Sequence, residues 1–468
     1  MAAGLSISEQ PPRVGAPPGP WSTFRGNLQR TGNTDNLPGP AKPAVLWVLK
    51  EQENFIAAPV PFDDRLFVAG LGTFNIARVH ALAVETKAEQ RIVWTKTTPS
   101  LKLPVVSSPA AIDKQIIFGD GMHQTDGGVL HCLNADDGLS LWQLSVPGRL
   151  VHLEGSPTVQ GERVYIGGGA AGVLCVQRNR VMLNGKERAL PDVRKILVRQ
   201  WRDMQQQAEA DRKKDPQFAP PADEDKLPKP MPIKQWQQGG GQWHVDAPVA
   251  VAGERVLVAS AYLDTEKVGI RAALCLDAST GTVMWRTPLK LNPWGGPSVH
   301  DDVVVIGGSN IRYDPGAIKH AKGEVVALDL ATGKLQWQRD VDGGVLSSVA
   351  LAGGLAVATA TDGKVYAFDL ATGATRWTYD ARTPFFAPPA IAGRTVYTAD
   401  LKCVVHAVSL DNGKGQWTLE LGRDPKVGVP GTVYGGPVVH NHRIFVATCQ
   451  LQRDAADRPG IVVCLGDN

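Results

Sequence analysis

Several features that would identify a function are missing from this sequence of 468 residues. None of its six cysteines stands next to another or in a C-x-x-C or C-x-x-C-H spacing, which excludes a haem attachment sequence and a paired-cysteine zinc site. Lysine and arginine number 49 against 46 for aspartate and glutamate, so no broad attraction to nucleic acid or to a membrane surface is expected. No apolar run approaches the roughly 18 residues of a membrane span.

The start of the chain and its glycine-rich stretches lack two further signatures. Met1–Ser8 has neither a basic n-region nor an apolar h-region, so we expect either a cytosolic protein or one from which a leader has been removed. Residues 167–169 and 239–241 open no helix after a strand, which excludes phosphate-binding loops. No nucleophile elbow stands at a strand-to-helix turn. We therefore predict no catalytic residues.

The sequence does contain a motif that is repeated after 40 residues. Val326–Trp337 reads VALDLATGKLQW and Tyr366–Trp377 reads YAFDLATGATRW. Each copy has alternating apolar strand residues, an Asp-x-x-Thr-Gly turn and a short strand that ends in tryptophan. Gly333 and Gly373 can adopt the positive φ that a tight hairpin needs. A lone four-stranded meander buries one face only, so copies must pack together, and radial closure of such sheets is a β-propeller.

Each repeat unit contains one tryptophan at the end of a strand and one residue that opens the next unit's first strand, so these two kinds of residue give the number of units. Eight of each occur, and five of the eight pairs are 12 residues apart, which selects Trp236 rather than Trp243 for the third unit. We predict an all-β fold, an eight-bladed β-propeller of four-stranded antiparallel blades. The tryptophans and openers are Trp47, Trp94, Trp142, Trp236, Trp285, Trp337, Trp377 and Trp417, and Pro59, Pro109, Pro157, Pro248, Pro297, Val349, Pro389 and Pro437.

The two ends of the chain complement each other. The last unit stops after residues 460–468, where its tryptophan strand should follow, and residues 44–49 supply that strand from the other end. Pairing them removes an exposed sheet edge. The propeller is predicted to span residues 44–468. Residues 1–43 are predicted to be a disordered leader followed by an ordered arm, Trp21–Gly32, that lies against the body.

An insertion at residues 178–234 interrupts the third blade. Its stretch Pro191–Lys214 is predicted to be a helix, because Leu197, Trp201 and Met204 form an apolar stripe at helical spacing. The rest is a proline- and charge-rich return. The helix either covers the outer end of one blade or docks a partner through this stripe, and we expect it to emerge on the face opposite the long loops.

Four cysteines occupy a slot that alanine fills in other units. The slot lies in a buried third strand, where cysteine acts as a small apolar side chain, and equivalent positions on different blades are too far apart for a disulfide. We predict structural thiols at these four positions and leave Cys403 and Cys449 open. The four are Cys132, Cys175, Cys275 and Cys464.

The ten histidines are scattered along the chain. Two pairs are close in sequence, His123 with His131 and His440 with His442. Loop and strand histidines at such spacings are more often solvated than metal-bound, so no metal site is predicted.

The repeated motif resembles the PQQ-like, or quinoprotein-type, β-propeller repeat. The resemblance covers roughly residues 44–468 and implies that each of the eight tryptophans docks on the neighbouring blade and girdles the ring. Residues 21–32 are also similar to the start of secreted bacterial PQQ-like propellers, which implies a periplasmic or secreted protein. From clearest to most degenerate, the copies are residues 327–337 and 367–377, then 276–285, then 134–142 and 408–417.

The resemblance implies one of two functional classes. PQQ-dependent dehydrogenases hold the quinone in the central channel on Ca²⁺ with an aspartate base, commonly beside two bridged adjacent cysteines, which this chain lacks. Glu154, Asn292 and Asp246 lie in loops that could face the channel and would form the Ca²⁺ set. The second class comprises non-enzymatic scaffolds similar to the propeller lipoprotein of outer-membrane assembly, which bind partner loops or peptides. No lipidation cysteine stands near this N-terminus.

We expect the scaffold class, without a cofactor and binding protein or peptide partners. The loops that link successive blades share one face with the loops between second and third strands, and their aromatics form a candidate hot spot. Alternatively, these aromatics plug the channel or pack between blades. The other function considered is a PQQ- and Ca²⁺-dependent dehydrogenase of alcohols or sugars, or a cofactor-less relic of one. The candidate binding residues are Trp243, His244, Trp294, Phe385, Phe386 and Tyr434.

Overall fold

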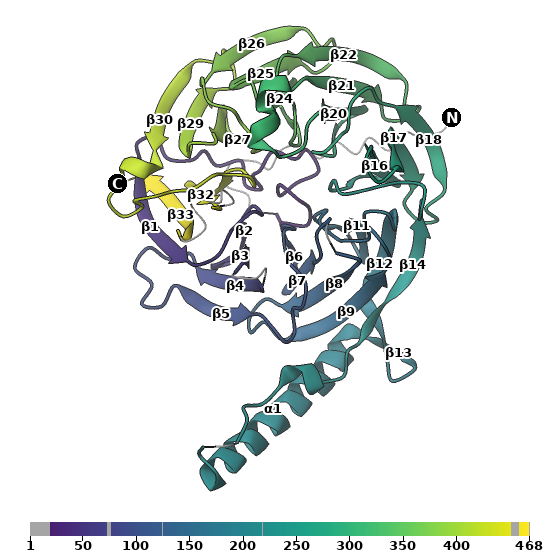
Figure 1. Cartoon of the computed structure of the whole chain (residues 1–468), viewed down its shortest axis with the longest axis vertical. Helices are drawn as coiled ribbons and strands as arrows, with labels where there is room; N and C mark the ends of the chain where they lie inside the picture. The colour runs from purple at the N-terminus through teal and green to yellow at the C-terminus, as the bar shows by residue number, and fades with distance from the viewer. Residues whose placement is uncertain (1–18, 73–75, 124, 218, 451–457, 468) are drawn as a thin grey trace.

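The computed structural model describes residues 19–72, 76–123, 125–217, 219–450 and 458–467. Within these ranges the strands form eight antiparallel sheets around a central axis, as the face view in Figure 1 shows. Seven sheets have four strands and the third has five. The predicted eight-bladed propeller is confirmed. Residues 1–18 of the expected leader lie outside the described residues.

Each blade is a meander. Its strands follow one another in order from the centre of the ring to the rim. Blade 1 consists of β2 (Val60–Phe62), β3 (Arg65–Leu71), β4 (Ala77–Ala83) and β5 (Ile92–Lys96), and blade 2 of β6 (Ala110–Ile112), β7 (Gln115–Gly119), β8 (Gly127–Asn134) and β9 (Ser140–Pro147). Blade 3 consists of β10 (Thr158–Gln160), β11 (Arg163–Gly167), β12 (Val173–Leu183), β13 (Lys186–Ala189) and β14 (Met231–Gln238). Blade 4 consists of β15 (Ala250–Ala252), β16 (Arg255–Leu263), β17 (Val268–Asp277) and β18 (Val283–Pro288).

The strands of blades 5 to 8 continue this order, and the last blade takes its fourth strand from the start of the chain. Blade 5 consists of β19 (Pro297–His300), β20 (Val303–Ser309), β21 (Gly323–Asp329) and β22 (Leu335–Val341), and blade 6 of β23 (Ala350–Ala352), β24 (Leu355–Thr359), β25 (Lys364–Asp369) and β26 (Thr375–Asp380). Blade 7 consists of β27 (Ala390–Ala392), β28 (Thr395–Ala399), β29 (Val404–Ser409) and β30 (Gly415–Glu420). Blade 8 consists of β31 (Val438–His440), β32 (Arg443–Ala447), β33 (Gly460–Asp467) and β1 (Pro43–Glu51).

The pairing of β1 with β33 closes the ring. The two strands are antiparallel, with Trp47 opposite Cys464 and Val48 opposite Val463. The predicted sharing of the last blade by the two ends of the chain is therefore confirmed. Because β1 covers the outer edge of β33, blade 8 is as complete as the others.

The eight repeat tryptophans join each blade to the next one. Every indole N–H donates to a backbone carbonyl of the following blade or, for the last, to the segment before β1. For five of the eight, namely Trp94, Trp236, Trp285, Trp337 and Trp377, the turn glycine of the next blade lies directly against the ring, as Gly373 does on Trp337. The donor–acceptor pairs are Trp47 with Val84, Trp94 with Ala135, Trp142 with Arg178, Trp236 with Ala278, Trp285 with Leu330, Trp337 with Leu370, Trp377 with Leu410 and Trp417 with Pro40.

The cysteine slot faces these tryptophans across the strand pair. Cys132 lies opposite Trp142, and Cys175 lies opposite Trp236. All four predicted structural thiols are buried, and burial raises the pKa of Cys175 to about 12. Cys403 and Cys449, which the sequence left open, are buried as well.

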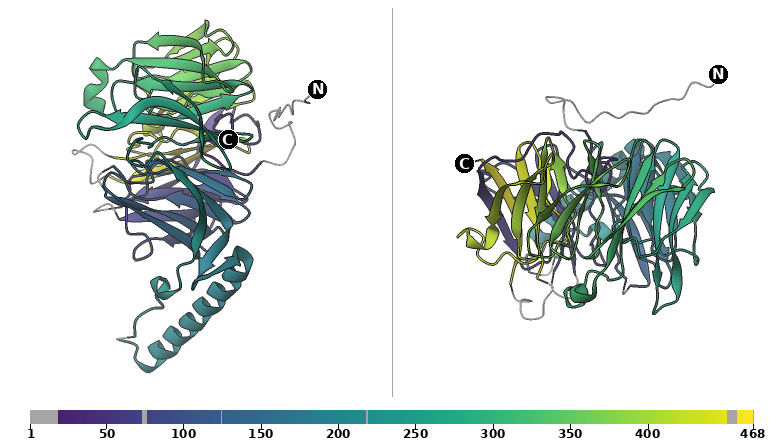
Figure 2. Two further views of the ribbon diagram at one scale, coloured as in Figure 1. Left: turned by 90° about the vertical axis from the view of Figure 1, so that its right-hand side faces the viewer. Right: turned by 90° about the horizontal axis from the view of Figure 1, so that it is seen from above.

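The N-terminal arm runs through the middle of the ring rather than along its outside (Figures 1 and 2). Trp21 forms an antiparallel bridge with Ala111 of blade 2, and the Thr31 carbonyl accepts a hydrogen bond from Ile391 N of blade 7. The Gly32 carbonyl accepts one from Val439 N of blade 8. The arm thus links innermost strands from opposite sides of the ring. It is ordered and lies against the blades, as predicted, and its place at the centre of the ring is a further finding.

Two buried arginines hold the arm in the channel. Arg25 donates from Nη1 to the Ser348 carbonyl at 2.8 Å, and Arg30 donates to the carbonyls of Val249 and Phe24. Burial lowers the pKa of both guanidinium groups, that of Arg30 to about 9. These charges are therefore met by backbone carbonyls of the arm itself and of the segments that enter blades 4 and 6.

The insertion projects outward from the rim of the disc (Figure 1). Helix α1 (Leu190–Lys214) buries Val193 and Leu197 against the cluster formed by blades 2 and 3, whereas Trp201 and Met204 are half-buried beside it. The interpretation that the helix covers a blade holds for its first half. The helix leaves from the rim rather than from a face, so the expected position of the insertion is wrong. Leu197 is buried and has no surface to offer a partner, so it does not belong to a docking stripe, while docking through the rest of the helix stays a prediction.

Short 3₁₀ helices complete the structure: η2 (Glu224–Lys226), η3 (Pro315–His320) and η4 (Leu421–Arg423). In η2, Glu224 accepts a hydrogen bond from Ser140 N at 2.9 Å and pairs with Lys96 at 2.5 Å. This contact anchors the return of the insertion to blades 1 and 2. Among the described residues, no helix has both the length and the apolar character needed to cross a bilayer.

Candidate functional site

A funnel of about 480 Å³ opens at the centre of the loop face. Its walls come from the loops that link successive blades and from those between second and third strands, and Phe24 of the arm is part of its lining. The arm therefore fills the channel below, while the loop face is left open to a ligand. Apolar wall residues include Ile56, Val106, Pro248, Leu263 and Pro388.

Aromatic side chains occupy one side of the funnel. The rings of Tyr313 and Tyr434 lie 6.1 Å apart, and Phe386 lies behind Tyr434 with ring centroids 5.4 Å apart. The Arg312 guanidinium stacks over Trp294 at 5.3 Å. Burial raises the pKa of Tyr434, which keeps its hydroxyl neutral.

Three of the six predicted binding residues reach this funnel and three do not. Trp294 and Tyr434 line it, and His244 belongs to its wall although the imidazole itself is buried. Trp243, Phe385 and Phe386 are 6%, 1% and 1% exposed, so the expectation that they present a surface is wrong. Trp243 and Phe385 pack between blades, and Phe386 packs behind Tyr313 and Tyr434 in the funnel wall, because large aromatic rings gain more from burial than from contact with water.

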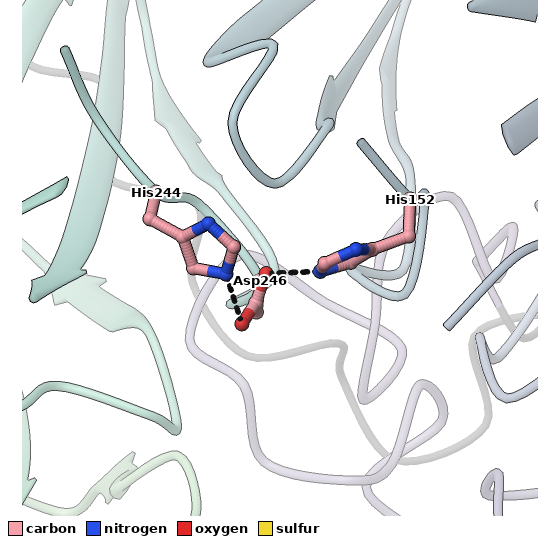
Figure 3. A group of neighbouring side chains, drawn as sticks. All are labelled: His152, His244 and Asp246. Atoms are coloured by element: carbon pink, nitrogen blue, oxygen red, sulfur yellow. Dashed lines mark hydrogen bonds and ion pairs between the residues drawn. The ribbon is translucent and has the colours of Figure 1, made fainter. Parts of the chain in front are cut away.

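Two histidines and an aspartate meet in the funnel wall (Figure 3). His152 comes from the loop between β9 and β10, while His244 and Asp246 come from the loop between β14 and β15. Asp246 accepts hydrogen bonds from both imidazoles, Oδ1 from His152 Nε2 at 2.8 Å and Oδ2 from His244 Nε2 at 2.9 Å. The inter-blade loops that precede blades 3 and 4 thus converge on one carboxylate.

The environment of this cluster keeps Asp246 ionised. Burial alone would raise the pKa of Asp246, but the charges and hydrogen bonds of His244 and His152 outweigh it and hold the pKa well below its ordinary range. Burial lowers the pKa of His152, and Asp246 more than compensates, so the net pKa of His152 is raised. Both imidazoles are fully buried, and neither Nδ1 atom has a hydrogen-bond partner among the described residues.

Glu154 extends the cluster toward the open funnel. Its Oε1 lies 4.0 Å from His152 Nε2 and 3.7 Å from His123 Nδ1, and it accepts a hydrogen bond from His123 N. Its hydrogen bond and charge raise the pKa of His123. With Asp246, Glu266 and Asp314, Glu154 gives the lining four carboxylates against the single guanidinium of Arg312.

Other histidines have structural partners. His131 is buried and bonds Asp120 at 2.8 Å, so the expectation of a solvated side chain is wrong for it. His440 pairs with Asp35 of the arm at 3.4 Å, and His442 donates from Nδ1 to the Pro38 carbonyl at 2.9 Å. Neither sequence pair forms a joint site.

The structure does not bring together the three residues considered for a Ca²⁺ set. Asn292 bonds the backbone of Tyr262 through both ends of its amide, so it does not join Glu154 and Asp246. Both oxygens of Asp246 accept hydrogen bonds from imidazoles.

Sequence reasoning found His244, Asp246 and Glu154 separately but missed His152 and the cluster itself. One signal was present: the inter-blade loops before blades 3 and 4 each contain a histidine two residues before an acidic residue, His152-Leu-Glu154 and His244-Val-Asp246. Aligning these two loops by their blades would have placed the two motifs side by side.

The chain is similar to known propellers. A family described as "Outer membrane protein assembly factor BamB" matches residues 40–190 and 274–458, more than half of the chain. The structure of BamB from Moraxella catarrhalis is similar with a TM-score of 0.56 and 15% identity, covering 90% of this chain and 97% of that one. No curated protein matches the chain by sequence.

Enzymes and a designed protein share the same architecture. A quinohemoprotein alcohol dehydrogenase from Pseudomonas putida HK5 has a TM-score of 0.61 at 12% identity, covering 96% of this chain and 80% of that one. The computationally designed Ika8 protein has a TM-score of 0.57 at 12% identity, covering 90% of this chain and 99% of that one. At such identities these likenesses concern the fold alone, so function must be argued from the funnel.

Proposed function

Because this chain belongs to the PQQ-like propeller family described as outer membrane protein assembly factor BamB, we propose that it is a non-enzymatic scaffold that binds a protein or peptide partner in the funnel of its loop face. The observation that carries the proposal is the shape and lining of that funnel. It is open on the loop face, and the buried arm with Phe24 lies beneath it. A short, protruding segment of a partner matches this concave form.

The lining sets the chemistry of the partner segment. Apolar walls and the rings of Trp294 and Tyr434 favour an apolar anchor side chain, as in binding hot spots. Glu154, Glu266 and Asp314 favour basic residues beside that anchor, since complementary charge raises the association rate and excludes acidic competitors. The proposed ligand is therefore a peptide loop with an apolar tip and basic flanks.

The compartment and a second contact surface belong to the same proposal. We place the protein in the periplasm or outside the cell, in line with the outer-membrane assembly role for which the matching family is named. The outer half of α1 offers the exposed faces beside Trp201 and Met204 as a further docking element. Deleting residues 186–230 tests it: loss of a partner that the funnel variants retain would support docking at the helix.

The dehydrogenase alternative is tested directly with the cofactor. The protein is mixed with PQQ and Ca²⁺, passed through gel filtration, and assayed for dye reduction by alcohols and aldose sugars. The scaffold proposal predicts that no quinone absorbance elutes with the protein. Retention of the quinone together with turnover would overturn it.

Selection from a displayed peptide library tests the binding proposal. Wild-type protein should enrich a consensus with an apolar residue flanked by lysine or arginine, and the double variant Trp294→Ala/Tyr434→Ala should lose it, because both rings line the funnel. Leu335→Ala is the matched control, since Leu335 is a 55% exposed apolar residue on β22 at the rim. Enrichment of the same consensus by the double variant would place binding elsewhere and contradict the proposal.

A further inference from the structure

The cluster of His152, His244 and Asp246 carries an inference independent of partner binding. We propose that it is a binding site for a divalent transition-metal ion, of which Zn²⁺ is the leading candidate. The donor atoms, two imidazole nitrogens and one carboxylate oxygen, all lie within 4.8 Å of one another. Two imidazoles with one carboxylate are a donor set of zinc and of other first-row transition metals.

The geometry needs little change to hold an ion. Donors bound to one zinc ion at about 2.1 Å each are separated by at most about 4.2 Å, so small side-chain rotations bring the three atoms into range. Asp246 already lies between the two Nε2 atoms, which point at it from two different loops. An ion would take the place of the Nε2 protons that now make these two hydrogen bonds.

The free Nδ1 atoms make this exchange possible. An imidazole that binds a metal through Nε2 must carry its proton on Nδ1. Neither His152 Nδ1 nor His244 Nδ1 has a partner among the described residues, so the hydrogen bonds given up when the proton moves are those from Nε2 to Asp246, which the ion replaces. The same lack of an outer acceptor leaves the imidazoles less basic than in a fully supported site, and we expect an exchangeable ion.

The remaining coordination position faces the funnel. Glu154, whose Oε1 is 4.0 Å from His152 Nε2, is the nearest further donor and is 23% exposed. A site with three fixed protein ligands and one open side is typical of ions that bind an additional ligand from solvent. The ion would thus also present a Lewis-acidic contact to whatever enters the funnel.

Cobalt and zinc titrations of the full chain, first dialysed against a chelator, test the proposal. Co²⁺ bound by imidazole and carboxylate gives a visible absorption band, which should saturate at one ion per chain. Zn²⁺ should displace it, and excess Ca²⁺ should not, because Ca²⁺ prefers oxygen donors. Absence of a saturable band, or displacement by Ca²⁺, would overturn the proposal.

Variants assign the ion to these residues. Asp246→Asn keeps the size of the side chain but loses its charge, and His244→Ala removes a donor. Either change should weaken binding by at least about a hundredfold, since losing only an outer-shell partner already costs about 10- to 100-fold. His320→Ala, an exposed histidine at the end of η3, should leave the affinity unchanged.

A stability measurement covers the case in which a variant folds poorly. Zn²⁺ should raise the melting temperature of the wild type by mass action and should not raise that of Asp246→Asn. Circular dichroism checks that the variant keeps its strands. Equal Zn²⁺ stabilisation of wild type and a folded Asp246→Asn would refute the assignment.

Discussion

At the scale of single residues, the turn glycines determine how closely the blades approach each other. Gly373 has a φ of +69°, and a Cβ placed there would lie 2.5 Å from Cδ2 of Trp337 in the preceding blade. Gly354 has a similar φ of +72° but no atom within 4 Å of such a Cβ. The two positions therefore share the same backbone demand and differ only in the contact with the tryptophan.

This pair yields the first prediction. Gly354→Ala should lower the free energy of unfolding by about 1–2 kcal/mol, the cost of a left-handed backbone for a residue with Cβ. Gly373→Ala should lower it by about 2–5 kcal/mol, because the clash with Trp337 adds to that cost. Chemical denaturation measures both, and equal losses would show that the glycine–tryptophan contact is not tight.

A second residue-scale feature is a buried ion cluster in blade 1. Glu53 accepts from His80 Nε2 at 2.9 Å and from Arg78 Nη1 at 2.8 Å. Burial alone would raise the pKa of Glu53, but the hydrogen bonds and charges of His80 and Arg78 outweigh it, so the net pKa lies below 4.5. A carboxyl group whose pKa is lower in the folded state stabilises the fold above its unfolded pKa and loses that contribution as the pH falls.

The pH dependence of stability should therefore differ between wild type and Glu53→Gln. The wild type should have the larger free energy of unfolding. This difference in stability should be constant at neutral pH and should shrink as the pH falls below about 4.5, the pKa of Glu53 in the unfolded chain. Melting temperatures of both proteins between neutral and acid pH measure it. A difference that stays the same, or grows, on acidification would contradict the cluster's role.

At the scale of elements, the insertion is a folded extension of blades 2 and 3. Val193 and Leu197 of α1 are completely buried against β9 and β12, and Glu224 in the return pairs with Lys96 of blade 1. Its outer half, by contrast, is mostly exposed. The helix therefore has an anchored base and an outer end that is open to contacts.

Weakening the base should loosen the whole insertion. Leu197→Ala should cost about 2–5 kcal/mol in the contact between helix and blade, as for other buried leucines. Limited proteolysis should then cut the insertion faster in this variant, whereas Arg199→Ala, an exposed neighbour, should behave as the wild type does. Unchanged cleavage of Leu197→Ala would mean that the helix is held by other contacts.

At the scale of the whole molecule, two long-range connections define the ring. The pairing of β1 with β33 closes it, and the arm ties its inner strands together through the centre. A cysteine pair tests the register of the closure. Val48→Cys/Val463→Cys should form a disulfide under mild oxidation and add about 2–4 kcal/mol of stability, because these residues face each other across the strands.

The control for this cross-link is a shift by one residue. Val48→Cys/Val462→Cys should not cross-link, because Val462 lies opposite Leu49 and its side chain points to the other face of the sheet. Mass spectrometry of the oxidised proteins distinguishes the two pairs. Equal yields would show that the register is wrong.

The fold was predictable because its signals are local. The Asp-x-x-Thr-Gly turn and the tryptophan recur within a single hairpin, so periodicity alone gave eight blades and the choice of Trp236. The path of the arm was not predictable, since Arg25 and Arg30 make contacts with residues more than two hundred positions away. Hydrophobic pattern also could not tell the buried Phe385 from the funnel-lining Trp294, because both stand in similar inter-blade loops.

The functional site, like the path of the arm, depends on contacts between residues that are far apart in the sequence. His152 and Asp246 are 94 positions apart and meet only because blades 3 and 4 are neighbours in a ring. No spacing rule for catalytic or metal sites spans such a distance. Such a site can be found from sequence only after the repeat has been aligned unit by unit.

The most direct test of the proposed scaffold function is photo-cross-linking from the funnel. A benzophenone amino acid is placed at Trp294 in one variant and at Leu335 in another, and each is irradiated with the peptide that the library selection yields. We predict that the peptide is attached through position 294 and not through position 335. Attachment through position 335 alone, or equal attachment at both, would contradict binding in the funnel.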